Sequence, residues 1–190
     1  MIIAISGFKG GVAKTTTALH LAGFLATRGS TLLVDADPNR SALRFSSAGP
    51  GLPYPVMSQN AAMKHIAGFQ HIVFDTPGNP DEDDLLDIAR GVDLMVLPTL
   101  PDRMSFDPLI QLEPKLRGAA YRVLVTLAPT PPERDGEGVR DSLEEAGLPV
   151  FKTVIHRRAG FKHAANGGYL VQPGEYDAFA EEVLELVPQR

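Results

Sequence analysis

Cysteine is absent from this chain of 190 residues. Its absence excludes disulfides, thiolate metal sites, iron–sulfur clusters and a cysteine nucleophile. No stretch approaches the roughly 20 consecutive apolar residues that a membrane span requires. The first residues lack the basic region and cleavage pattern of a signal peptide. We therefore expect a cytoplasmic protein whose stability comes from the packing of an apolar core.

The overall composition is that of a globular domain. Hydrophobic residues make up 44% of the chain and charged residues 22%, which argues against wholesale disorder, collagen-like repeats and coiled coils. Two stretches rich in proline and glycine, residues 48–55 and 128–132, are predicted to be loops. Neither flank of these loops has enough strand and helix signal for a core of its own. A single domain over residues 1–190 is therefore expected.

Short β-branched runs alternate with longer helical patterns along the chain. Strands are predicted at residues 2–5, 31–34, 71–74, 94–97, 122–125 and 150–155. Helices are predicted at residues 15–28, 58–66, 81–90, 106–116, 138–146, 158–165 and 175–187. Nearly continuous apolar strands are typical of a parallel sheet that is covered on both faces. The alternation predicts an α/β fold with a doubly wound, mainly parallel sheet, helices on both faces and ligands at the carboxyl ends of the strands.

The most informative segment is residues 6–16, SGFKGGVAKTT, between the first predicted strand and the first predicted helix. Glycines in such a turn let backbone N–H groups converge on phosphate oxygens, and the helix N-terminus adds its positive dipole end. Lys14 is expected to reach the β- and γ-phosphates, and the Thr15 hydroxyl to coordinate Mg²⁺, which prefers oxygen ligands. Phe8 and Ala13 stand at the two glycine positions of the standard phosphate loop. The pattern alone therefore leaves an ordinary glycine-rich turn open.

A family resemblance removes that ambiguity. Residues 9–16, KGGVAKTT, resemble the deviant Walker A motif K-G-G-x-x-K-[ST]-T of the ParA/MinD class of P-loop ATPases. Residues 35–39, DADPN, are similar to the D-x-D-P-Q segment of ParA proteins, with Asn39 in place of glutamine. Residues 74–78, FDTPG, resemble the Walker B motif and second switch of that class. The resemblance extends from residue 2 to about residue 172, with weaker similarities at residues 97–107 and 151–165.

The resemblance implies a P-loop NTPase that binds ATP and Mg²⁺ and hydrolyses ATP to ADP and phosphate. In this class a signature lysine, here Lys9, crosses to the other subunit's nucleotide, so that ATP joins a sandwich dimer. The class places a water-orienting aspartate at the position of Asp37 and a carboxylate that holds Mg²⁺ at the position of Asp75. The implied catalytic residues are Lys9, Lys14 and Asp37, the metal residues are Thr15 and Asp75, and the nucleotide-binding residues are Lys9, Gly10, Gly11, Val12, Ala13, Lys14, Thr15 and Thr16. Ala13 adds a Cβ where glycine is usual, which bears on the hydrolysis rate more than on binding.

Charge is unevenly distributed along the chain. The net charge is −5, yet residues 151–173 contain no Asp or Glu and carry +4 from Lys152, Arg157, Arg158 and Lys162. Both a local anion-binding surface and pairing of these cations with acids elsewhere are compatible with this segregation. In a partition ATPase of the resembled class, such a patch grips DNA phosphates without reading sequence. We expect Arg157, Arg158 and Lys162 to bind DNA, and Lys152, within a predicted strand, to be turned away.

Several branches of the class fit poorly. A MinD-like membrane ATPase needs a basic amphipathic carboxyl-terminal helix, but this terminus is acidic, so no membrane partner is expected. The nitrogenase iron protein needs cluster cysteines. We expect no helix-turn-helix before the first strand, and in this respect the chain resembles the short, ParF-like partition proteins, which also lack one. The sequence therefore predicts an ATP-dependent DNA segregation ATPase.

The predicted partners are a second copy of the chain, joined by ATP, non-specific DNA and a ParB-like centromere-binding adaptor. The protein is expected in the cytoplasm, on the nucleoid when ATP is bound. An amide synthase resembling dethiobiotin synthetase and a nucleotide-gated scaffold remain alternatives. The plasmid or chromosomal cargo and the adenine contacts are left open.

Overall fold

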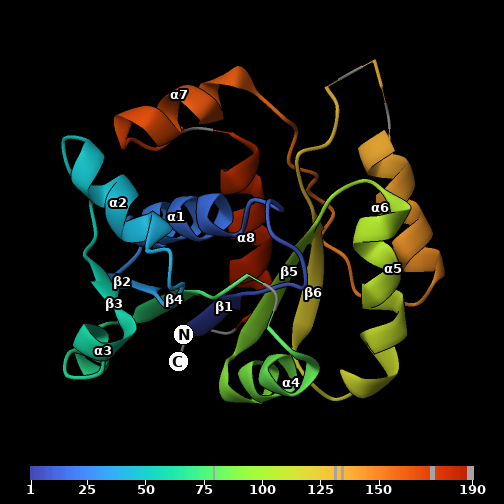
Figure 1. Ribbon diagram of the computed structural model, residues 1–190, viewed down its shortest axis with the longest axis horizontal. Coiled ribbons are helices and arrows are strands. Elements are labelled where there is room, and N and C mark those ends of the chain that lie inside the picture. The colour runs from blue at the N-terminus through green and yellow to red at the C-terminus, as the bar shows by residue number, and fades with distance from the viewer. Residues whose placement is uncertain (79, 131, 134, 172–173, 188–190) are drawn as a thin grey trace.

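The computed structural model describes residues 1–78, 80–130, 132–133, 135–171 and 174–187. Six parallel strands in this part of the chain form one sheet in the order β3-β2-β4-β1-β5-β6 (Figure 1). The strands are β1 (Ile2–Ile5), β2 (Thr31–Asp35), β3 (Val56–Ser58), β4 (His71–Asp75), β5 (Leu94–Thr99) and β6 (Tyr121–Val125).

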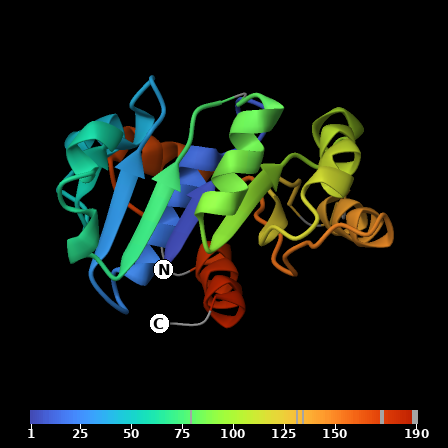
Figure 2. The same cartoon turned by 90° about the horizontal axis from the view of Figure 1, so that it is seen from below.

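Helices cover both faces of the sheet. One face carries α1 (Lys14–Leu25), α8 (Glu175–Leu186), α2 (Ser41–Ala48) and α7 (Ala159–Gly167). The other carries α3 (Gln59–Ala62), α4 (Glu82–Gly91), α5 (Arg103–Leu112) and α6 (Asp135–Glu145), as Figures 1 and 2 show. The predicted doubly wound α/β fold is thus confirmed.

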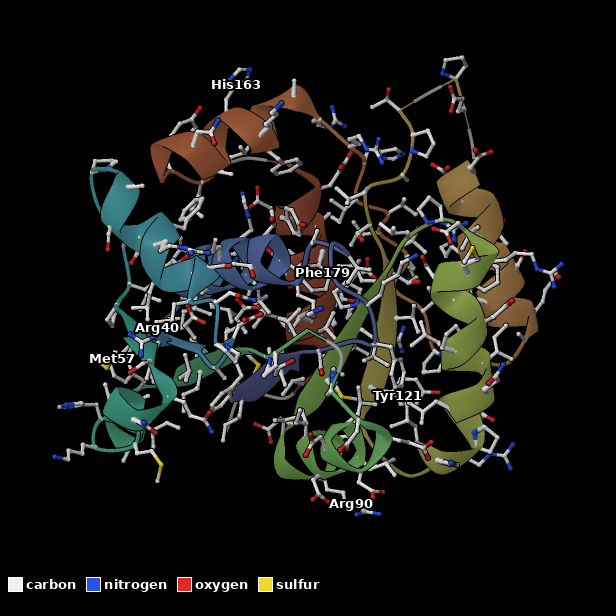
Figure 3. The ribbon with its side chains drawn as sticks, viewed as in Figure 1. Arg40, Met57, Arg90, Tyr121, His163 and Phe179 are labelled. Carbon is white, nitrogen blue, oxygen red and sulfur yellow. The ribbon has the colours of Figure 1, made fainter. Side chains whose placement is uncertain are left out.

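Alternation along the strands builds the two layers of the core. Ile3 and Ile5 of β1 point toward α1 and α8, where buried Phe179 lies at the centre of the molecule (Figure 3). Met95 and Leu97 of β5 point the other way, toward α4 and α5. Side chains that alternate between two buried faces explain why these strands are apolar at nearly every position.

Some elements differ from the sequence-based expectations. Neither the short strand β3 nor the helix α2 was predicted, and the helix expected at residues 58–66 is reduced to α3 and a 3₁₀ turn at Ile66–Gly68. The predicted loop at residues 48–55 is irregular after Ala48, where α2 ends. In the predicted loop at residues 128–132, Pro131 lies outside the described residues.

The strand predicted at residues 150–155 is wrong, because the segment makes only isolated bridges, such as that between Val150 and Val123. Phe151 and Ile155 do donate backbone hydrogen bonds to β6. Between them, however, the N–H groups of Lys152 and Thr153 donate to the Glu182 carboxylate of α8, at 2.8 Å each. A side chain from a distant helix therefore takes the Thr153 donor that would have continued the ladder to β6.

Candidate functional site

The carboxyl ends of β1, β2 and β4 surround a cavity of about 510 Å³. Its walls come from the segments after these three strands: residues 10–11 and 13–16, residues 37–39 and Ser41, and Pro77 and Gly78. Ligands in open α/β sheets bind at this edge. The structure thus brings the Walker A-like, D-x-D-like and Walker B-like segments of the sequence together around one space.

The loop after β1 has the backbone shape of a phosphate cradle. Gly11 and Ala13 both adopt left-handed conformations, with φ of 80° and 62°. Ala13 is the N-cap of α1 and offers no side-chain cap, so the first N–H groups of the helix remain available to an anion. A left-handed non-glycine residue is strained by roughly 1–2 kcal/mol. Ala13 therefore adopts a left-handed backbone conformation that glycine accepts readily and alanine disfavours.

Lys14 is held inside this loop. Its ammonium is buried and donates a 2.8 Å hydrogen bond to the Lys9 carbonyl. Burial lowers the pKa of Lys14, and the nearby carboxylates of Asp75 and Asp37 partly oppose this effect. The side chain is therefore a preplaced cation that gains further stabilisation from a bound anion.

Lys9 behaves differently. Its side chain is exposed and reaches across to α5, where its ammonium donates to the Ser105 hydroxyl at 2.9 Å. Ser105 in turn donates to Asp102, the N-cap of α5, at 2.8 Å. The structure thus places Lys9 against α5 of its own chain, at the edge of the site. No sequence pattern predicts the contact with Ser105.

Asp75 ends β4 with both carboxylate oxygens fully buried. Burial raises its pKa to about 7, the neighbouring Asp35 and Asp37 add to the rise, and Thr15 and Lys14 oppose it. Neither oxygen accepts a hydrogen bond of ordinary geometry from the described residues. Such a group is costly to bury. An unsatisfied carboxylate beside the Thr15 hydroxyl fits a hard cation such as Mg²⁺.

The two aspartates after β2 have distinct environments. Asp35 is buried and accepts backbone hydrogen bonds from Asp37 and Leu43, at 3.2 and 2.9 Å, so it fixes the course of the chain into α2. Asp37 is half-buried on the cavity wall and accepts from the Asn39 N–H at 2.7 Å. Asp37 is therefore placed to act on a ligand, whereas Asp35 is structural.

Thr126 is a supporting residue that sequence reasoning missed. It follows β6, is fully buried, and its hydroxyl lies 3.1 Å from the carbonyl oxygens of Val12 and of Thr99. It thereby ties the phosphate loop to the end of β5. The only signal was a threonine at the end of an apolar strand, which does not identify its partner.

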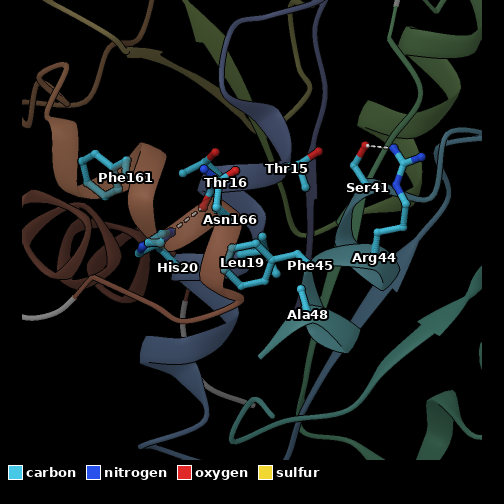
Figure 4. A pocket seen from close by; sticks show the side chains of 12 residues that line it. Thr15, Thr16, Leu19, His20, Ser41, Arg44, Phe45, Ala48, Phe161 and Asn166 are labelled. Atoms are coloured by element: carbon cyan, nitrogen blue, oxygen red, sulfur yellow. Dashed lines mark hydrogen bonds between the residues drawn. The ribbon is translucent and has the colours of Figure 1, made fainter. Parts of the chain in front are cut away.

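A second cavity, of about 430 Å³, continues from the first between α1, α2 and α7 (Figure 4). The two cavities share Thr15, Thr16 and Ser41. Phe161 and Asn166 of α7 line the far wall. The cavity is therefore open to a ligand that extends from the phosphate loop toward α7.

His20 lies beside this second cavity. Its Nε2 accepts from the Val171 N–H at 3.1 Å, so Nδ1 carries the proton and donates to the Thr16 carbonyl at 2.8 Å. Burial lowers the pKa of His20. The neutral ring thus connects α1 with the segment that follows α7.

The predicted DNA-binding residues surround the start of α7, and all three are exposed. Arg158 forms an ion pair with Glu175 of α8. Arg157 and Lys162 form no ion pair with any described residue. The neighbouring His163 points outward from α7 (Figure 3). The patch is therefore less positive than the sequence implied, because an acid from outside the segment compensates Arg158.

Two further expectations concern this segment and the membrane. Lys152 is exposed but does not lie in a strand, and Gln172 and Pro173, the last residues of the acid-free segment, lie outside the described residues. Across the described ranges, no helix has the length and apolar character needed to cross a bilayer.

Comparisons with known proteins place this architecture in a family context. The family model of the CobQ/CobB/MinD/ParA nucleotide-binding domain matches residues 3–171. The chain is 33% identical to the maintenance of carboxysome distribution protein A of Gloeobacter kilaueensis, over 88% of this chain and 82% of that protein.

Solved structures share the fold at lower identity. An ATP complex of a Cyanothece McdA variant superposes with a TM-score of 0.73 at 17% identity, covering 97% of this chain and 95% of that one. A Borrelia burgdorferi protein described as a plasmid partition protein, bound to AMPPNP, superposes with a TM-score of 0.70 at 17% identity, covering 97% of both chains. The expected cofactor ATP thus agrees with the ligands of proteins that share this fold.

Proposed function

Because the chain belongs to the CobQ/CobB/MinD/ParA family of nucleotide-binding domains, we propose that it is an ATPase that binds Mg²⁺-ATP, dimerises around it and positions a cargo over DNA. The observation that carries the ATPase assignment is the buried, unsatisfied Asp75 beside Lys14 and Thr15. A carboxylate, a cation and a hydroxyl around a phosphate cradle are the parts that phosphoryl transfer requires.

Each residue at the cavity has a separate task in this proposal. Lys14 contacts the β- and γ-phosphates, and the N–H groups at the start of α1 hold their oxygens. Thr15 and Asp75 hold Mg²⁺, which neutralises charge on the phosphates when it is bound. Asp37, on the cavity wall, orients the attacking water. The adenosine extends into the second cavity, where Phe161 packs on it.

Lys9 is the residue that makes ATP join two subunits. A single site already has its lysine in Lys14, and the exposed Lys9 ammonium is attached to Ser105 by one hydrogen bond. Exchange of that bond to a neutral hydroxyl for a contact with the anionic phosphates of the partner's nucleotide is favourable, because both groups are then charged. The dimer is therefore expected only with ATP.

DNA binding is expected at the start of α7. Arg157 and Lys162 supply the phosphate contacts, and Arg158 contributes less because Glu175 compensates it. One subunit offers too few contacts for strong binding at physiological salt. Dimerisation doubles them on one rigid body, which raises the apparent affinity without new residues. Association with the nucleoid in the cytoplasm would follow.

The cargo is a plasmid, a chromosome or a protein body, held through a ParB-like adaptor or its equivalent. The Gloeobacter relative is named for carboxysome distribution, and the Borrelia relative for plasmid partition. These names support a positioning ATPase more than an amide synthase.

A mobility-shift assay on two unrelated duplexes tests the proposal. We expect both duplexes to shift with ATP, weakly or not at all without it, and less as salt rises. Arg157→Ala combined with Lys162→Ala should abolish the shift while ATP-dependent dimerisation survives. Glu175→Gln, which releases Arg158, should strengthen the shift. Failure of the ATP-bound protein to shift either duplex at low salt would remove the DNA-binding part of the proposal.

A further inference from the structure

An apolar groove crosses the sheet face between α3 and α4. Only 12 residues connect β3 to β4, and they form the four-residue α3 and a single 3₁₀ turn. This connection crosses over β2 without forming a full helix. Phe74 of β4 is only half-buried between the two helices, whereas every residue of β2 is buried.

The floor of the groove is hollow because its central residue is small. Ala4 of β1 lies in register between Phe74 of β4 and Met95 of β5. The resulting cavity, of about 270 Å³, is lined further by Ile88 and Val92 at the end of α4. Phe74, Ile88 and Val92 are only half-buried. Mainly apolar side chains, with Gln59 and Thr76 as the polar members of the lining, thus surround a space large enough for one or two side chains.

The α4 rim of the groove is acidic. Asp81, Asp83 and Asp84 are exposed and form no ion pair with any described residue. Asp84 lies four residues before Ile88, so the two share one face of α4, while Asp83 lies about 140° around the helix from Ile88. The carboxylate at Asp84 is therefore a charge at the edge of the apolar hollow.

We propose that this groove docks a short segment of a partner protein, in which lysines or arginines flank one or two apolar anchor residues. The apolar hollow accepts the anchors, and the acidic rim attracts the cations. A second copy of this chain fits less well, because a two-fold contact would bring two acidic turns together. Anionic lipid is repelled for the same reason.

The groove is connected to the nucleotide cavity through Pro77. This residue lines both cavities and follows Asp75 by two positions. A partner segment that fixes Pro77 therefore changes nucleotide affinity, and nucleotide changes partner affinity by the same factor. Only this linkage rests on the proposed ATPase function; the docking itself does not.

A fluorescent peptide titration tests the docking. The probe is a twelve-residue peptide with one leucine and one phenylalanine between four lysines, and a control peptide has serines in place of the two apolar residues. We expect Asp84→Lys to weaken binding of the probe about fivefold or more, and Asp83→Lys to change it less than about twofold. The two variants carry the same charge change in the same helical turn, so both face the same cost to the helix.

The outcomes separate clearly. Equal losses in both variants, equal binding of the serine peptide, or no binding of the probe would overturn the docking proposal, as would self-association that Asp84→Lys abolishes. Repeating the titration with Mg²⁺-ATP tests the linkage, and equal affinities with and without nucleotide would overturn it. A separate titration with a fluorescent ATP analogue shows whether the ATPase proposal itself has failed.

Discussion

The two ends of the phosphate loop differ in how they hold their lysines. At the carboxyl-terminal end, Lys14 is buried, bonded to the loop's own backbone and close to Asp75 and Asp37. At the amino-terminal end, Lys9 is exposed and bonded to a hydroxyl on α5. A side chain fixed within its own loop suits binding, whereas one attached by a single exposed contact suits exchange between partners. One loop can therefore serve two tasks.

The largest effect on folding stability is expected for Asp75→Asn, which tests how strongly burial destabilises the charged groups beside Lys14. The folded-state pKa, about 7, exceeds the ordinary value of 3.8, so ionisation of Asp75 destabilises the nucleotide-free protein. That contribution is absent below about pH 4, grows as the pH rises and is complete above about pH 7. A rise of about 3 pKa units corresponds to about 4 kcal/mol. The variant should gain up to this much stability at pH 8.

Urea unfolding of both proteins at pH 5 and pH 8 measures this gain. His20, with its lowered pKa, makes stability fall as the pH drops below about 6.5 in wild type and variant alike. The difference between the two proteins therefore isolates Asp75. If the difference in unfolding free energy between the two proteins does not grow from pH 5 to pH 8, ionisation of the buried Asp75 does not destabilise the folded protein.

Lys14→Ala should weaken Mg²⁺-ATP binding about 100-fold, because it removes charge-assisted contacts worth about 1.5–3 kcal/mol each. Titration with a fluorescent ATP analogue measures the affinity. Lys64→Ala, a change at an exposed lysine outside the cavity, is the matched control and should bind normally. Wild-type affinity in Lys14→Ala would mean that the two ends of the loop do not differ as described.

Asp37→Ala should lower the turnover rate about 100-fold while leaving ATP affinity within about threefold, since an orienting carboxylate acts chiefly in the transition state. Steady-state phosphate release, with affinity measured in parallel, provides the test. Asp83→Ala, at an exposed position that does not line the cavity, serves as the control. Unchanged turnover in Asp37→Ala would transfer the role to another carboxylate.

The smallest effect is expected for Ala13→Gly. Glycine relieves the left-handed strain but increases the freedom of the unfolded chain by about 0.4–1 kcal/mol, so we expect a net gain of about 0.5 kcal/mol. Ala165→Gly, at an exposed position inside α7, should instead lose about 1 kcal/mol. Thermal or urea unfolding compares the two. Loss of stability in Ala13→Gly would show that the loop is not strained at this residue.

The sequence predicted those features that depend on local pattern. Alternating apolar strands and helices identified the fold, and the glycine and lysine spacing at residues 9–16 identified the loop that now lines the cavity. The segments at Asp37 and Asp75 could be grouped around one ligand because parallel strands end at the same edge of the sheet.

The features that the sequence missed depend on partners far away in the chain. Glu182 takes the Thr153 N–H group that would have continued a seventh strand, Ser105 holds Lys9, and Glu175 compensates Arg158. In each case the deciding side chain is at least 17 residues away, and no periodicity or motif connects the pair. Contacts between single residues of distant elements are therefore the features of this fold that could not be predicted from the sequence.

Sedimentation velocity of the wild type and of Lys9→Ala, each with and without Mg²⁺-ATP, tests most directly whether the two ends of the loop have separate tasks. We predict that the wild type changes from monomer to dimer when ATP is added, and that Lys9→Ala binds ATP with near wild-type affinity yet remains a monomer. A Lys9→Ala protein that dimerises normally, or a wild type whose mass does not depend on ATP, would contradict this account.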